Sequence, residues 1–428
     1  MTVARRLPET RAGDLLRLCL TLAGGLLRRP RAFSIRQGLR SWTRDTGVRY
    51  GSADFIVRVG SKTFVVVGSQ SFSDAILAVP PREAGISAGN LKRGGMQFLA
   101  PQALTITNDE QWQRLRALNE EVLEPGRLHD DERAFLAAVR RAFTEPVRNA
   151  HDVRSAMSRA MVDIVFGPGV APASIGHDVS ELFGYVQSPL KRALLAPVGK
   201  RRRARFRAEL ARACDAAASS SAPSLAGRAA RGAHAVSRAE LLDQVPHWMF
   251  TFTRSGTELL VRALALVCAH PDARDRVRAE VAALGRSDSP GQSRALAFAS
   301  ACVREAAYLY PPVTRTFHRA SEGAVAGGVA IPAGAEIASS LPPVEVERAG
   351  PRRFDPARWL APSGGPTDFD PFLTGPRRCP GRDLISLVCA VALAELVARQ
   401  DLTLARPRLV PNDLPVELSG GSVRFRAG

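Results

Sequence analysis

"FLTGPRRCPG", residues 372–381, stands directly before the apolar run "RDLISLVCAVALAELVARQ". The run contains no Gly or Pro and is long enough to predict a buried helix. Cys379 therefore lies at the amino-terminal end of that helix, where the helix dipole and free backbone N–H groups stabilise a thiolate. The same N–H groups, directed at a metal-bound sulfur, would weaken its donation and tune a redox potential.

The residues around Cys379 narrow the kind of site. A single Cys without a second Cys or a His nearby argues against zinc, because structural zinc sites need four ligands. Gly375 and Gly381 let the backbone pass close to a flat, bulky group, and Arg377 can reach a carboxylate on it. The alternative, a buried structural Cys at a Pro-Gly turn, would not require Phe372 and these neighbours at fixed offsets.

Length and pattern predict one large globular domain. The chain has 428 residues, 45% of them hydrophobic, and shows no internal repeat or Gly/Ser linker. Strand-like runs occupy residues 50–85 and 312–345, and the region from 108 to 305 is almost entirely helical in pattern. We therefore expect a mainly α fold with small β-sheets, built as an N-terminal extension (1–35) and one domain (36–428).

The charge balance favours acidic partners. The formal net charge is +18, and the excess is almost all arginine. A basic chain attracts nucleic acid, acidic lipid or acidic proteins, although a compositional bias of the genome would give the same excess. The chain has no zinc-finger spacing and only 6% aromatic residues, so we expect no nucleic-acid binding. Its six scattered cysteines favour a reducing cytoplasm over a disulfide framework.

The segment "GDLLRLCLTLAGGLLRRP" (13–30) resembles a signal or anchor only superficially. Arg17 interrupts it, and it is too short to span a bilayer. A helix packed on the protein body is the main expectation, and a peripheral helix at a membrane surface is the alternative. Further along, Gly60 marks a hairpin, residues 270–285 form an amphipathic helix, and "GGVAIPAGAEIASSLP" offers two short strands around a Pro-Ala-Gly turn.

The pattern Phe372-x-x-Gly375-x-Arg377-x-Cys379-x-Gly381 matches the haem-binding signature of the cytochrome P450 family in full. The chain therefore resembles a P450 of the soluble bacterial type. The resemblance implies that Cys379 is the axial thiolate of haem iron, a ligand whose strong donation favours O–O cleavage. It also implies the P450 fold, with haem b held between a long distal helix and the cysteine helix.

Two further segments extend the resemblance. Trp112 and Arg116 match a family motif that holds a haem propionate, and side chains at i and i+4 share one helix face. "EAAYLYPPVTRTFHRA" (305–320) resembles the family's Glu-x-x-Arg helix and the strand after it. On that strand His318 best matches the position that usually meets the second propionate, with Arg319 as the neighbouring alternative.

The sequence departs from the family pattern in the Glu-x-x-Arg motif. Tyr308 stands where relatives have the Arg, so Glu305 is expected to pair with Arg353 instead. Such a pair would avoid an unpaired buried carboxylate.

The distal helix is the second departure. In "MFTFTRSGTELLVRAL" (249–264), Gly256 would let the helix bulge to leave room for O2, and Glu258 is followed by Leu259 where the family has Thr. Glu258, and Thr257 if the register shifts, are the candidate catalytic groups of a proton relay. A solvated Glu258 is the alternative. Ser255 is among the residues expected to line the pocket.

The function implied by the resemblance is a haem-thiolate monooxygenase. It would use O2 and electrons from NAD(P)H, delivered by an acidic ferredoxin or flavodoxin, on a small organic substrate of secondary metabolism. A cytoplasmic monomer is expected. The alternatives are a related enzyme that uses peroxide or performs a rearrangement or coupling, and a catalytically silent scaffold.

Overall fold

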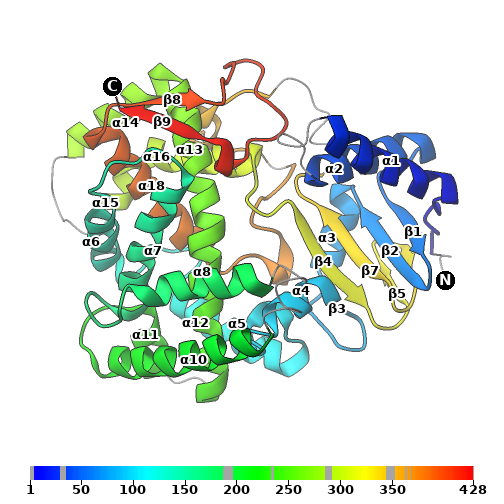
Figure 1. Ribbon diagram of the computed structural model, residues 1–428, viewed down its shortest axis with the longest axis horizontal. Helices are drawn as coiled ribbons and strands as arrows, with labels where there is room; N and C mark the ends of the chain where they lie inside the picture. The colour runs from blue at the N-terminus through cyan, green and yellow to red at the C-terminus, as the bar shows by residue number, and fades with distance from the viewer. Residues whose placement is uncertain are drawn as a thin grey trace.

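The computed structural model describes residues 4–28, 35–186, 196–232, 236–284, 292–343, 352–361, 364–366 and 368–427. Helices gather on one side of the molecule, and the largest sheet lies on the other side beneath α1 and α2 (Figure 1). The expectation of a mainly α fold with small β-sheets is therefore confirmed.

The α-helices of the described chain follow one another in this order: α1 (Ala12–Arg28), α2 (Ile35–Tyr50), α3 (Gln70–Leu77), α4 (Asn90–Met96), α5 (Asp109–Leu123), α6 (Glu132–Ala142), α7 (Ala150–Phe166), α8 (Ser174–Val186), α10 (Ala196–Ser219), α11 (Leu225–Arg231), α12 (Arg238–Thr251), α13 (Thr257–Ala269), α14 (Pro271–Leu284), α15 (Gln292–Ala295), α16 (Ala297–Leu309) and α18 (Arg382–Arg399). The strands are β1 (Phe55–Val59), β2 (Lys62–Val67), β3 (Ile86–Ala88), β4 (Arg315–Ala320), β5 (Ala324–Ala326), β6 (Val329–Ile331), β7 (Glu336–Ser340), β8 (Leu402–Arg406) and β9 (Arg424–Ala427).

The largest sheet joins segments that are far apart in the sequence. Its strand order is β1-β2-β7-β4-β3, and β2 pairs with β7 in parallel while the other pairs are antiparallel. The predicted hairpin is confirmed, with Gly60 at φ +58° in the turn between β1 and β2. The two short strands predicted around the Pro-Ala-Gly turn are also confirmed, and they belong to different sheets: β6 pairs with β5, and β7 joins the large sheet.

The N-terminal segment is attached to this sheet. Glu9 bridges to Ile56 of β1, and the Trp42 indole of α2 donates to the carbonyl of Asp14 in α1 at 2.8 Å. This confirms the prediction of a helix packed on the protein body, although Leu16 and Leu20 of α1 remain exposed. Within the described ranges, no helix is both long and apolar enough to cross a membrane.

A buried polar network fixes α5 against α12. The Trp248 indole of α12 donates to the side-chain oxygen of Asn119 in α5 at 2.7 Å, and the Asn119 amide donates to Gln244 at 3.3 Å. Buried polar groups in such a network specify one relative placement of their helices, because each group is costly to leave unpaired. The network therefore sets α5 at a defined place beside the helix expected to cross the distal side.

Candidate cofactor site

Cys379 closes a tight loop at the start of α18. Its backbone N–H donates to the carbonyl of Phe372 at 2.8 Å, and the Gly381 N–H is hydrogen-bonded to its sulfur. Burial raises the pKa of the Cys379 thiol, while the Gly381 N–H and the positive charges of Arg116 and Arg382 oppose the rise. The loop therefore holds one sulfur at a helix start, with the Gly381 N–H as a hydrogen-bond donor to it.

The two glycines of the loop differ in how closely protein atoms approach them. Gly375 has φ +61°, and a Cβ there would lie 2.9 Å from the Leu77 carbonyl oxygen at the end of α3. Its small size therefore serves the contact with α3, which differs from the expectation that it faces a flat bound group. A Cβ on Gly381 would lie 3.7 Å from the Phe252 ring of the distal helix.

Trp112 and Arg116 lie on α5 next to the cysteine loop. Trp112 is buried, and Arg116 donates to the carbonyl of Arg378 at 2.5 Å while it is ion-paired with Glu120 at 2.7 Å. The structure therefore brings the predicted propionate-binding pair to the residue that precedes Cys379.

Arg377 and His318 meet across the sheet edge. The Arg377 guanidinium donates to the carbonyl oxygens of Val79 and Ile86 at 2.8 and 2.7 Å, and its third nitrogen lies 2.9 Å from His318 Nδ1. Because a guanidinium only donates, Nδ1 accepts and the His318 proton sits on Nε2. Burial holds the pKa of His318 well below its ordinary value. Strand alternation turns Arg319 to the opposite face, where it contacts Asn90.

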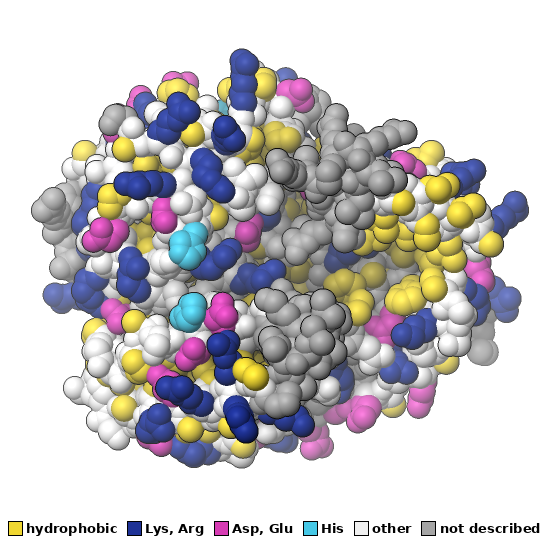
Figure 2. Space-filling model, viewed as in Figure 1, with side chains coloured by type: hydrophobic (Ala, Val, Ile, Leu, Met, Phe, Trp, Pro, Cys, Tyr) yellow, Lys and Arg dark blue, Asp and Glu magenta, His cyan; other side chains and the backbone are white. Residues whose placement is uncertain are grey.

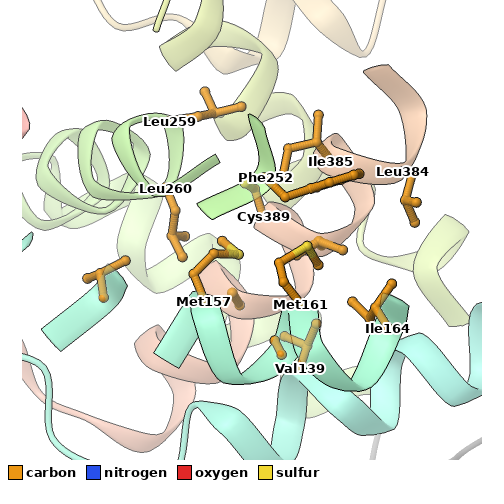
Figure 3. Packing of buried hydrophobic residues seen from close by; sticks show 14 of the residues in the cluster. Val139, Met157, Met161, Ile164, Phe252, Leu259, Leu260, Leu384, Ile385 and Cys389 are labelled. Carbon is orange, nitrogen blue, oxygen red and sulfur yellow. The ribbon is translucent and has the colours of Figure 1, made fainter. Parts of the chain in front are cut away.

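The distal helix has the predicted bulge, but for another reason. Residues Phe252–Gly256 form a π-turn between α12 and α13. A Cβ on Gly256 would lie 2.5 Å from Cδ1 of Ile385, and the Cys389 thiol donates to the Gly256 carbonyl at 3.6 Å. Phe252 and Ile385 lie side by side in the core between these helices (Figure 3). Gly256 therefore makes room for α18, and the expectation that it makes room for O2 is not supported.

The predicted relay residues are engaged elsewhere. The Glu258 carboxylate accepts from the Gly420 N–H at 3.2 Å and forms an ion pair with Arg262 at 3.2 Å, which ties it to the C-terminal loop. Thr257 is fully buried, and its hydroxyl donates to the Thr253 carbonyl within its own helix. These contacts do not support a role for Glu258 and Thr257 in proton delivery.

A different stripe of the distal helix is polar and partly accessible. His247, Thr251 and Ser255 recur at every fourth position, so they share one face, and each of them is half-buried. This stripe lies next to Phe252 and Gly256, the positions that contact the cysteine helix. The Thr251 hydroxyl donates to the His247 carbonyl of its own helix at 2.9 Å, so Ser255 is the candidate distal alcohol on this face, and the residue before it is the exposed Arg254.

Comparison with known proteins points to one family. The family model described as cytochrome P450 matches residues 225–416. One solved cytochrome P450 aligns with a TM-score of 0.72 at 16% identity, over 91% of this chain and 98% of that chain. A 6-coordinated cytochrome P450 from Thermus thermophilus aligns with a TM-score of 0.66 at 18% identity, with the same coverage. The resemblance to the cytochrome P450 family is therefore supported over residues 225–416 by the family model, and the fold is that of the solved cytochromes P450.

The curated relatives match a smaller region. "Cytochrome P450 734A5" of Oryza sativa subsp. japonica is 29% identical over 40% of this chain and 34% of its own length. "Cyclooctat-9-en-7-ol 5-monooxygenase" of Streptomyces melanosporofaciens is 30% identical over 37% of each chain. The chain thus spans about a third of the length of the curated relatives it matches.

The protein retains the Glu of the Glu-x-x-Arg motif, but other residues bind its carboxylate. Fully buried Glu305 accepts from Arg358 through both carboxylate oxygens, from the Trp359 indole at 2.7 Å and from the Asp355 N–H at 3.1 Å. The expected partner, Arg353, is exposed and does not take part. The Glu305–Arg353 prediction is therefore wrong, because the chain turns through a 3₁₀ segment (Pro356–Trp359) that presents Arg358 instead.

Tyr308 has become part of this cluster. The Arg358 guanidinium lies 5.0 Å from the centre of the Tyr308 ring, a cation–π arrangement, and the Trp359 ring meets Tyr308 edge to face at 6.1 Å. Its hydroxyl is hydrogen-bonded to the Asp368 carboxylate at 3.0 Å. The Tyr308 ring thus supports Arg358, the arginine that pairs with Glu305 in this chain.

The residues around Cys379 fit a haem, the cofactor that the cytochrome P450 match implies. Haem carries two carboxylates, and this region holds buried polar atoms without a hydrogen-bond partner, namely Nε2 of His318 and Nδ1 of His247. The neutral His318 would donate from Nε2 to a carboxylate. Cys379 offers one sulfur, and no group of three or more His, Cys, Asp or Glu among the described residues offers a separate metal site.

Sequence reasoning missed one charged residue here. Burial lowers the pKa of Lys92, in the first turn of α4, to about 8, and Arg377 contributes to the shift while Cys379 opposes it. Lys92 also contributes to lowering the pKa of His247 to about 3. Both Lys92 and His247 are half-buried. No local pattern marks Lys92, because a lysine in an amphipathic turn is ordinarily a solvated one.

Proposed function

We propose that the chain is a haem-thiolate monooxygenase. The observation that carries this proposal is the setting of Cys379, whose sulfur stands at the start of α18 with the Gly381 N–H bonded to it. Burial raises the pKa of the free thiol, so the sulfur keeps its proton until a metal cation displaces it, since metal ligation requires the deprotonated form. Cys379 would then hold the haem iron through its sulfur.

When bound, a haem with a thiolate ligand supplies activation and cleavage of O2. The chain's own residues hold and orient that group: Arg377 and His318 at one carboxylate, and Trp112 with Arg116 at the other. Phe372 closes the loop through its carbonyl, and Gly381 tunes the sulfur through its N–H. Ser255 is the alcohol of this face of the distal helix.

The substrate proposed is a small organic molecule of secondary metabolism, in line with the named activity of the Streptomyces relative. Electrons would come from NAD(P)H through an acidic ferredoxin or flavodoxin, since complementary charge steers such encounters. The net charge of +18 supports a partner of that sign. Lys and Arg side chains are spread over the face in Figure 2 and do not form one stripe. The protein would act as a monomer in the cytoplasm.

The carbon monoxide difference spectrum of the reduced protein tests the proposal. The wild type should show the red-shifted Soret band of a thiolate-ligated haem, and Cys379→Ser should lose it, because an alcohol cannot supply the anionic sulfur donor. Cys19→Ser is the matched control, since Cys19 is exposed on α1 and should leave the band unchanged. A Cys379→Ser variant with a normal band would refute the proposal.

A second candidate is an enzyme of the same fold that uses peroxide or carries out a rearrangement or coupling. The observation in its favour is that Glu258 is bonded to the C-terminal loop and that Arg254 precedes the distal alcohol. Product formed with hydrogen peroxide alone, at a rate above that with NAD(P)H and redox partners, would favour this candidate. The alternative of a catalytically silent scaffold was based on Tyr308. That basis no longer holds, since Tyr308 supports Arg358 and the Glu305 carboxylate has its hydrogen-bond donors.

A further inference from the structure

Lys92 is a half-buried cation beside the candidate cofactor site, and it has no counter-ion among the described residues. Within the described residues, its ammonium group makes no hydrogen bond or ion pair to a protein group, although Arg377 and Cys379 lie close enough to influence it. A buried charge without a partner is costly, and proteins keep such charges where a ligand pairs with them. Lys92 therefore needs an anion that the protein chain itself does not provide.

Local geometry brings Lys92 to the carboxylate-binding edge. Ala88, the last residue of β3, is paired with His318 of β4, and the next residue, Gly89, donates to the Phe317 carbonyl at 3.2 Å. A Cβ on Gly89 would lie 3.0 Å from the His318 carbonyl oxygen, so α4 begins in direct contact with that strand. Lys92 follows one turn later, with its N–H donating to the Gly89 carbonyl at 3.1 Å.

Three elements thus converge on one place. The β3–α4 connection carries Lys92, β4 carries His318, and the cysteine loop carries Arg377, which is bonded both to His318 and to the Ile86 carbonyl of β3. On the far side Lys92 influences His247 of the distal helix. The cationic end of Lys92 therefore lies between the cysteine loop and the distal helix, at the edge of the space that separates them.

The charge balance favours a carboxylate of the cofactor over one from a substrate. Haem brings two negative carboxylates, and of the two arginines that face them Arg116 is already ion-paired with Glu120. Arg377 alone would leave one carboxylate charge without a cation. Lys92 supplies the missing charge.

We propose that Lys92 binds a haem propionate together with Arg377 and His318, as one carboxylate-binding cluster built from α4, the cysteine loop and β4. This inference rests on the proposed haem-binding function. Lys92 is a positioning residue in this role, since it holds the cofactor at its edge and does not touch the reacting atoms. The cluster gives the region that follows β3 a direct part in retaining the cofactor.

The test is the rate at which the holoprotein loses haem to excess apomyoglobin. Lys92→Met should lose haem faster by about tenfold to a hundredfold, the range expected for a hydrogen bond between charged groups. Lys92→Arg should stay near the wild-type rate because it keeps the charge. Lys62→Met is the matched control, since Lys62 is exposed in the β1–β2 turn.

A second experiment removes the haem carboxylates instead of the Lys92 cation. With haem dimethyl ester in place of haem, the wild type and Lys92→Met should lose the group at the same rate. Equal loss of ordinary haem from the two proteins would overturn the inference, even if Lys92→Met weakened the binding of a carboxylate ligand such as a fatty acid. Faster loss of the dimethyl ester from Lys92→Met would also overturn it, as a general packing defect. A wild type that takes up no haem would instead refute the proposed function.

Discussion

The carboxylate of Glu305 is held by Arg358, fifty-three residues further along the chain, through both of its oxygens. This pairing replaces the contact that relatives make within one helix, where the motif places an arginine three residues after the glutamate. A buried carboxylate needs hydrogen-bond donors around it, but any segment of the chain can supply them.

Arg358→Met should destabilise the protein by about 2–4 kcal/mol, because it leaves Glu305 buried and short of its charged partner. Arg353→Met, the same substitution at an exposed position shortly before the turn that begins at Asp355, should change stability by less than about 0.5 kcal/mol. Urea unfolding followed by circular dichroism measures both. Equal urea midpoints for the two variants would mean that Arg353 is as much a partner of Glu305 as Arg358.

Restoring the family residue with Tyr308→Arg should lower stability. The new guanidinium would stand beside Arg358, and the Glu305 oxygens are already occupied by Arg358, Trp359 and Asp355. Tyr308→Phe removes only the bond to Asp368 and should cost about 1 kcal/mol. A thermal midpoint for Tyr308→Arg above that of the wild type would contradict this account of the cluster.

Gly256→Ala should cost about 1–3 kcal/mol, because its methyl group would overlap Cδ1 of Ile385 at 2.5 Å. The test is a double substitution: in an Ile385→Val background, which removes that carbon, Gly256→Ala should cost much less. Unfolding midpoints of the four proteins give the coupling directly. Costs that simply add would mean that Gly256 is needed for something other than the contact with α18.

Ser255→Ala should lower product formation by about tenfold and increase release of hydrogen peroxide per NAD(P)H consumed, if Ser255 is the alcohol that transfers protons. Thr257→Val is the control, since the Thr257 hydroxyl is bonded within its own helix. The same product and peroxide assays on Thr257→Val should match the wild type. A larger effect at Thr257 than at Ser255 would return the relay to the register first expected from the sequence.

Haem retention should depend on pH through Lys92. Burial holds its pKa at about 8 in the free protein, and a bound carboxylate would raise it. Binding is then strongest below pH 8 and weakens as pH rises above it, because the free lysine must regain a proton. The charged or titratable groups around it are Arg377 and Cys379 of the loop, His247 of α12 and His318 of β4.

The measurement is the ratio of haem dissociation constants for Lys92→Met and the wild type at about pH 7 and about pH 9, on either side of the pKa of Lys92 in the free protein. Titration of the Cys379 thiol affects both proteins and cancels in the ratio. The ratio should fall toward one as pH rises. A ratio that is constant across this range would show that Lys92 does not change its charge in this step.

Local patterns predicted those parts of the site that depend on neighbours in sequence. The cysteine loop, the Gly60 hairpin and the helix that contains Trp112 and Arg116 follow from turn residues and periodicity over a few positions. The rotation of the distal helix about its axis cannot be predicted in this way. Two overlapping stretches, "TFTRS" and "SGTEL", each give a plausible register for the family pattern. Only the contact of Gly256 with Ile385, which is far away in the sequence, distinguishes them.

The roles of Arg358 and Lys92 could not be predicted from the sequence, and the physical reason is the same for both. Each acquires its role from a pairing between distant segments: Arg358 from the turn that crosses α16, and Lys92 from the pairing of β3 with β4. In the sequence both look like ordinary surface cations, which is what most lysines and arginines are.

The parallel pairing of β2 with β7 sets an order of assembly. Residues 62–67 cannot complete their hydrogen bonds until residues 336–340 have been synthesised, and β3 likewise depends on β4. During translation the first strands therefore leave the ribosome as a two-stranded hairpin, which is marginal on its own, with the edge of β2 open for some 270 residues. A chain truncated before β4 should accordingly fail to form the large sheet and should aggregate through that edge, even though its early helices are complete.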